Sequence, residues 1–176
     1  MDEISSFIIK YQALVVGGLG FAGVIYTIYY NAKNQLELQN EKIKHDVRTL
    51  RVAFKTELLA NKDAYETRIE QFSKPKDNYK DALIKNKSIN DIYKTLLSNI
   101  GQLSEKEVEN IYDAYQVIGE LQYRLRILAG TDSIAGYESE FITFNQVDLD
   151  YVNQLHELFL PSIVKAIDSI NHELDQ

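Results

Sequence analysis

The chain has 176 residues and a formal net charge of −7 at pH 7, and residues 101–176 alone hold 4 basic against 14 acidic side chains. This acidic half disfavours nucleic acid as a partner, because neutralising phosphates requires basic side chains. The absence of cysteine excludes disulfides, thiolate catalysis and cysteine-ligated zinc.

Residues 11–30 read YQALVVGGLGFAGVIYTIYY and carry no charged side chain. A helix of about 20 apolar residues rises about 30 Å, the thickness of the hydrocarbon core of a bilayer. We therefore predict a transmembrane helix at 11–30 after a short N-terminal segment at 1–10. The alternatives are a buried core helix and a cleaved signal peptide. The signal peptide is disfavoured by the acidic start, the length of the run and the lack of an A-x-A site.

Two features of this run predict how it sits in a membrane. Tyrosines at its ends suit the headgroup boundary, where a ring is half-buried and its hydroxyl stays in water. These membrane-interface aromatics are Tyr11, Tyr26, Tyr29 and Tyr30. Small residues spaced four apart let two helices approach closely, although glycine is also common in membrane helices generally. The predicted span packing face consists of Ala13, Gly17, Gly18 and Ala22.

Basic residues follow the run, whereas the segment before it is acidic. Basic flanks are retained in the cytoplasm. The juxtamembrane basic residues are Lys33, Lys42, Lys44, Arg48 and Arg51. We therefore predict a single-pass protein of the inner (plasma) membrane with its N-terminus outside and its C-terminal domain in the cytoplasm.

Residues 31 to about 72 contain no proline or glycine, and their apolar residues recur mostly at steps of three or four. One long helix is thus expected to continue from the span. Its polar first part, 31–46, predicts an exposed stalk or a short coiled coil between subunits. A richer apolar stripe begins at Val47, which predicts a helical bundle domain over 47–176. The apolar stripe of the whole helix consists of Leu36, Ile43, Val47, Leu50, Phe54, Leu58, Tyr65, Ile69 and Phe72.

Capping and breaking residues divide the rest of the domain. Pro75 ends the long helix, and Asp91 is the expected N-cap of a short helix that Gly101 closes. Ser104 and Glu107 form a capping box, S-x-x-E, at the start of a helix that should run from Glu105 to about residue 129.

The last 46 residues or so are expected to hold an irregular connection and a final helix. Residues 131–146 are irregular, with a short extended piece at EFITF. Asp148 or Asp150 then caps a helix to about Leu174, and Pro161 predicts a kink near residues 156–158 or a break. The predicted fold is all-α, with a four-helix, bundle-like cytoplasmic body. Its tyrosines are interpreted as core residues: Tyr65, Tyr93, Tyr112, Tyr115 and Tyr123.

The sequence contains no residue pattern typical of a catalytic, metal-binding or phosphate-binding site. Di-iron bundles use Glu-x-x-His, and no glutamate lies three residues before His45, His156 or His172. The glycines at 17–20 lack the Lys-Ser/Thr end of a phosphate loop. We therefore predict no enzyme activity, no catalytic residue, no metal and no cofactor.

Two segments carry a resemblance to a known class of proteins. Arg48–Glu66 reads RTLRVAFKTELLANKDAYE, and Ile92–Ile118 reads IYKTLLSNIGQLSEKEVENIYDAYQVI. Together with the single N-terminal span, this layout resembles small single-pass bacterial inner-membrane proteins of unassigned function. The resemblance implies a helical cytoplasmic domain and carries no site residues with it.

These observations favour a membrane-anchored helical scaffold whose cytoplasmic domain binds a protein partner or a second copy of itself. The lipid bilayer is the other expected partner. The alternative is a membrane-acting sensor or effector, of a stress or phage-defence type, whose assembly through the span alters the membrane. The glycine-rich span is what motivates that alternative.

Overall fold

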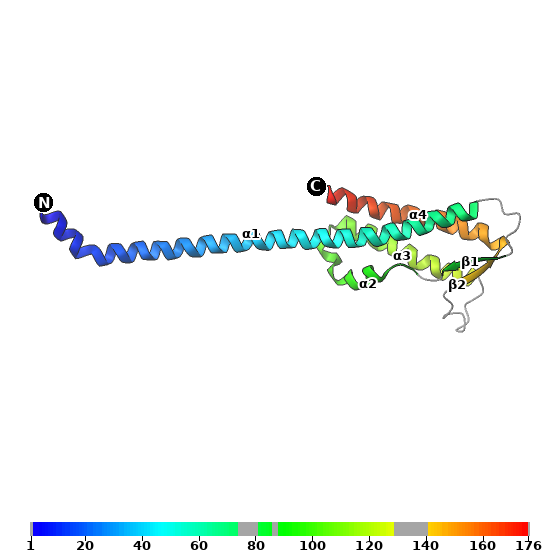
Figure 1. The fold of residues 1–176 in the computed structure, drawn as a ribbon, viewed down its shortest axis with the longest axis horizontal. Coiled ribbons are helices and arrows are strands. Elements are labelled where there is room, and N and C mark those ends of the chain that lie inside the picture. The colour runs from blue at the N-terminus through cyan, green and yellow to red at the C-terminus, as the bar shows by residue number, and fades with distance from the viewer. Residues whose placement is uncertain (1, 74–80, 86–87, 129–140, 176) are drawn as a thin grey trace. The chain divides into compact units, whose positions relative to one another are not determined.

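The computed structural model describes residues 2–73, 81–85, 88–128 and 141–175, and these residues are mainly helical (Figure 1). The chain divides into two compact units, Met1–Asp46 and Val47–Gln176, which we describe separately. The elements in chain order are α1 (Asp2–Ser73), β1 (Asp81–Lys85), α2 (Asp91–Leu96), the 3-10 helix η1 (Leu97–Gln102), α3 (Glu105–Leu128), β2 (Phe141–Asn145) and α4 (Gln146–Leu174).

The first unit consists of the first part of α1. This helix is long and apolar enough to cross a membrane, and none of its most apolar window is buried within the protein. Leu19 and Phe21, for example, are 70% and 69% exposed. Glycine costs about 1 kcal/mol relative to alanine in a helix in water. The helix nevertheless continues through four glycines, and one of their carbonyls, that of Gly23, accepts a 2.8 Å hydrogen bond from the Thr27 hydroxyl.

The second unit has one hydrophobic core, to which α1, α3 and α4 contribute most residues. In Figure 1, α3 and α4 run alongside the part of α1 that belongs to this unit. The apolar stripe predicted on α1 is confirmed here, because Leu50, Phe54, Leu58 and Tyr65 are all buried. The α3 and α4 contributions include Ile111, Ala114, Ile118, Leu121, Leu125, Val152, Leu155, Phe159, Ile163 and Ile170.

The capping box at the start of α3 is confirmed. The Ser104 hydroxyl accepts a 3.4 Å hydrogen bond from the Glu107 backbone N–H, and the Glu107 carboxylate accepts one of 2.9 Å from the Ser104 backbone N–H. The helix then runs from Glu105 to Leu128, close to the predicted range. The prediction that Tyr112 and Tyr123 are core residues is wrong, however, because these residues are 56% and 62% exposed. Their spacing of eleven residues places them on one face of α3, opposite the buried face.

The short helix α2 differs from the prediction at both ends. Asp91 is its first helical residue rather than its N-cap, and the side chain at the N-cap position, Asn90, makes no capping hydrogen bond. Gly101 does not close it, because α2 ends at Leu96 and the chain continues as η1 to Gln102. A carboxylate from another helix caps α2 instead, as described below.

The extended piece predicted at EFITF is confirmed over its described residues as strand β2. It pairs antiparallel with β1, in a register that places Leu83 opposite Thr143. Helix α4 follows β2 directly at Gln146, so the predicted caps at Asp148 and Asp150 are wrong, and Asp148 lies in the first turn. The paired register ends with Asp81 opposite Asn145.

Pro161 lies inside α4, which continues unbroken to Leu174, so the predicted break is wrong. The physical reason is the position of the ring. Pro161 is exposed, whereas Phe159 and Ile163 on the opposite side are buried. The carbonyl that loses its partner therefore belongs to the solvent side, where water satisfies it. The predicted stop at Pro75 and the irregular segment at 131–140 lie outside the described residues.

Candidate functional site

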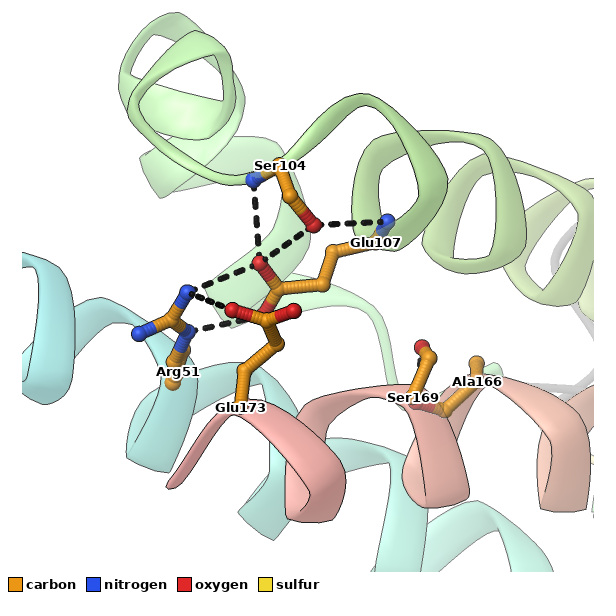
Figure 2. Close-up of polar contacts among 6 residues, drawn as sticks. All are labelled: Arg51, Ser104, Glu107, Ala166, Ser169 and Glu173. Carbon is orange, nitrogen blue, oxygen red and sulfur yellow. Dashed lines mark hydrogen bonds and ion pairs between the residues drawn. The ribbon is translucent and has the colours of Figure 1, made fainter. Parts of the chain in front are cut away.

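The most extensive buried polar group among the described residues is a network that joins three helices of the second unit (Figure 2). Arg51 of α1 donates from Nε to Glu107 Oε1 at 2.7 Å and from Nη2 to Glu107 Oε2 at 2.9 Å. The same Nη2 donates to Glu173 Oε2 of α4 at 3.1 Å. The Ser104 hydroxyl and backbone N–H both donate to Glu107 at 2.9 Å. One guanidinium thus links the start of α3 to the end of α4.

Glu107 is almost fully buried, with a side chain only 1% exposed, yet it is held in its ionised form. Burial alone favours the neutral acid and raises its pKa. Hydrogen bonds from Arg51 and Ser104 outweigh burial, and the pKa of Glu107 lies below its ordinary value. The same bond to Glu107 raises the pKa of Arg51. Arg51 binds Glu107 through two hydrogen bonds, and each charged side chain of the network has an oppositely charged partner. We call Arg51, Glu107 and Glu173 the clamp, because they hold three helices together rather than forming a reactive group.

Glu57, 3% exposed, forms a second polar centre less than two turns further along α1. Its carboxylate accepts from the backbone N–H groups of Ile92 and Tyr93 at 2.7 and 2.9 Å, and so caps α2. It also accepts from the Tyr115 hydroxyl at 2.6 Å. Burial and this bond raise the pKa of Tyr115. The ring of Tyr115 stacks on Tyr93 at 4.0 Å between centroids, which holds α2 against α3.

A third centre surrounds His156, a fully buried residue of α4. Its Nδ1 lies 2.7 Å from the Val152 carbonyl, so we assign the ring proton to Nδ1. Its Nε2 then accepts from Nη1 of Arg68 at 3.3 Å. The ring of Tyr65 lies edge-on at 5.0 Å. Burial, assisted by the positive charge of Arg68, lowers the pKa of His156 to about 4, so the ring is neutral at pH 7.

The residues predicted from the sequence as membrane-related lie on α1, with one difference. Tyr26 and Tyr30 are exposed and stack with their centroids 6.2 Å apart. A Cβ added at Gly17 or Gly18 would meet nothing within 4 Å, whereas the side chain of Ala13 lies outside the described residues. Arg51 differs from the other predicted basic residues, because it belongs to the second unit and is ion-paired with Glu107. The other predicted residues on α1 are exposed: Tyr11, Ala22, Tyr29, Lys33, Lys42, Lys44 and Arg48.

Sequence reasoning missed Glu57 and His156. Each is a polar residue on an apolar helical face, and its apolar neighbours are the sequence signal that could have predicted its burial. Glu57 lies beside Leu58 and one turn from Phe54, and His156 follows Leu155. Which groups would pair with them depends on α2, α3 and Arg68, which no local pattern specifies.

Comparison with known proteins identifies no relative: no family, no curated protein and no solved structure matches the chain. Within the described ranges, no group of three or more histidine, aspartate or glutamate side chains is placed to hold a metal ion.

Replacing Arg51 by alanine should lower the free energy of unfolding by about 3 kcal/mol, because Glu107 then remains buried without its cation. Glu173→Gln should cost about 1 kcal/mol or less, since Glu173 is partly exposed and the Arg51–Glu107 pair remains. Urea unfolding of the full chain in detergent, followed by circular dichroism, measures both. Arg48→Ala is the matched control on the exposed side of α1. Equal losses for Arg48→Ala and Arg51→Ala would contradict the clamp.

Stability should fall as the pH drops from about 6.5 towards 4. In that range the unfolded His156 binds a proton that the folded ring does not bind, because its folded pKa is about 4. The loss between pH 7 and pH 5 should be about 2 kcal/mol. Urea unfolding at both pH values should show this loss in the wild type and not in His156→Gln. Glu107 contributes only at lower pH, because its depressed pKa lies below 4.5. A His156→Gln variant with the same pH dependence as the wild type would contradict a neutral buried ring.

Proposed function

We propose that the chain is a membrane-anchored interaction protein: the first part of α1 inserts in the bilayer, and the second unit binds protein in the cytoplasm. The single observation that carries the proposal is the contrast between the units. The second unit closes its own core, whereas the apolar window of the first is 0% buried. An exposed apolar surface of that size marks a membrane or protein contact. Its length of about 20 uncharged residues favours the membrane.

The exposed face of α3 supports protein binding by the second unit. Positions 112, 116, 119, 123 and 127 recur at helical spacing, and all five are exposed. Tyr112, Tyr123 and Ile127 make this face partly aromatic and apolar, with exposures of 56%, 62% and 47%. A Cβ added at Gly119, between them, would meet nothing within 4 Å, so this position is open to solvent. Tyrosine is enriched at protein interfaces because it offers a large rigid surface with a polar end.

The basic residues that follow the apolar run support the proposed orientation. Lys33, Lys42, Lys44 and Arg48 are exposed on α1, so their charges are available to cytoplasmic headgroups. Asp2 and Glu3 precede the run. We infer from these flanks that the second unit lies in the cytoplasm and that residues 1–10 lie on the other side of the membrane.

Single-cysteine variants test the membrane topology cleanly, because the chain has no cysteine of its own. In intact spheroplasts, a membrane-impermeant maleimide should label Ser6→Cys and leave Gln154→Cys unlabelled until the cells are lysed. Both variants should remain in the membrane fraction after a carbonate wash. Labelling of Gln154→Cys in intact cells would reverse the orientation, and release by carbonate would exclude a span.

Photocrosslinking tests the α3 face. With p-benzoylphenylalanine in place of Tyr123, illumination of cells should give a discrete adduct, either a dimer of this chain or a complex with one other protein. The same probe at Gln154, an exposed residue of α4, is the matched control and should give none. Adding Tyr112→Ser should reduce the Tyr123 adduct about fivefold, the loss expected on removing about 1 kcal/mol of contact. Monomer alone from both positions would refute partner binding through this face.

A further inference from the structure

Helix α3 carries a row of six residues whose spacing is the same from either end. The intervals along this row are 3, 4, 3, 4 and 3 residues. Alternating steps of three and four keep successive side chains on one side of a helix, where a second helix can pack along them. We call these residues the α3 row, and all six are at least partly exposed: Glu109, Tyr112, Gln116, Gly119, Tyr123 and Arg126.

The two ends of the α3 row carry opposite charges. Glu109 is exposed near the start of α3, and Arg126 is partly exposed in its last turn. The midpoint of the row lies between Val117 and Ile118. When two copies of α3 pack antiparallel about this midpoint, Glu109 of each copy lies opposite Arg126 of the other. Two such pairs form, because a two-fold axis repeats every contact.

The four inner residues of the α3 row are also matched in this arrangement. Tyr112 of each copy meets Tyr123 of the other, and paired aromatic rings stabilise an interface beyond the area that they bury. Gln116 meets Gly119, where an added Cβ would contact nothing within 4 Å. The longer side chain thus lies over the residue that has none, and facing helices interdigitate when large and small residues alternate in this way.

The charges of the α3 row select the antiparallel direction. In a parallel pair, Glu109 would lie beside Glu109 of the other copy, and Arg126 beside Arg126. Like charges that face each other across an interface are costly. The helix dipoles favour the same choice, because the antiparallel pair places opposite helix ends together. The match between the two halves of the row therefore favours a second copy of this chain as the partner.

We propose that the α3 row is the interface of a two-fold symmetric dimer in which two copies of α3 pack antiparallel. The two-fold axis runs perpendicular to α3 at the midpoint of the row. This inference rests on the proposed function, because it names the partner that the exposed face of α3 binds. The residues of the clamp take no part in the dimer contact.

Exchanging the charges tests the antiparallel pair. The full chain in density-matched detergent micelles should sediment as a dimer. Glu109→Arg and Arg126→Glu should each weaken this dimer at least tenfold, since each turns two attractive pairs into two repulsive ones. An equimolar mixture of the two variants should form a heterodimer within about threefold of the wild-type affinity, because every arginine again meets a glutamate. Lys165→Glu reverses an exposed charge of α4 and is the matched control, which should leave dimerisation unchanged.

The double variant Glu109→Arg/Arg126→Glu restores both pairs within one chain and should dimerise as the wild type does. Its circular dichroism melting curve, with those of the single variants, separates loss of pairing from loss of fold. A mixture of folded single variants that stays monomeric, or a double variant that does, would overturn the proposal. Equal dimerisation of the wild type and both single variants would also overturn it.

The oligomeric state also distinguishes this inference from the proposed function. A wild-type chain that is monomeric in micelles, yet gives an adduct with another protein from position 123, would overturn the self-pair and leave the proposed function intact. A monomeric chain with no adduct would overturn both.

Discussion

The ion pair between Arg51 and Glu107 is the constraint on which the second unit depends. Glu107 completes the capping box of α3 with the same carboxylate that binds the guanidinium, so the first turn of α3 and its position against α1 are set together. Glu173 adds the end of α4 to the same guanidinium. A buried pair gains little over an apolar pair of the same volume, whereas breaking it leaves an uncompensated charge. The pair and its partner Glu173 therefore connect α1, α3 and α4 in the arrangement observed.

Helix α1 presents polar side chains to the rest of the second unit at successive positions along its length. Arg51 pairs with α3 and α4, and Glu57 caps α2 and accepts from α3. Asn61 donates to the Ile89 carbonyl just before α2. Further along α1, the Tyr65 hydroxyl has no hydrogen-bond partner among the described residues, and Arg68 lies 3.3 Å from the neutral ring of His156.

The two units place apolar residues in opposite environments. Leu50, Phe54 and Leu58 are enclosed by α3 and α4, whereas Leu36 and Ile43, earlier in the same stripe, are 60% and 59% exposed. Periodicity is the same in both parts, because it reports only that one helical face is apolar. What covers that face depends on whether other parts of the chain return to it. In the second unit, other helices return and cover the apolar face of α1. In the proposed function, the bilayer or a second copy of the chain covers the apolar surface of the first unit.

The sequence by itself determined what short-range physics controls: the uncharged run, the long α1, the capping box at Ser104 and Glu107, the extent of α3 and the strand within EFITF. Each depends on neighbours within a few residues. Only the tertiary structure decided that Tyr112 and Tyr123 face outward, that Glu57 rather than Asp91 caps α2, and that α4 passes through Pro161. Those outcomes depend on groups 35 or more residues apart, such as Glu57 and Ile92, or on which side of a helix the core lies. Arg51 shows the difference most plainly. Its position after the apolar run predicted a basic flank, and the approach of Glu107 from α3 made it a buried ion pair.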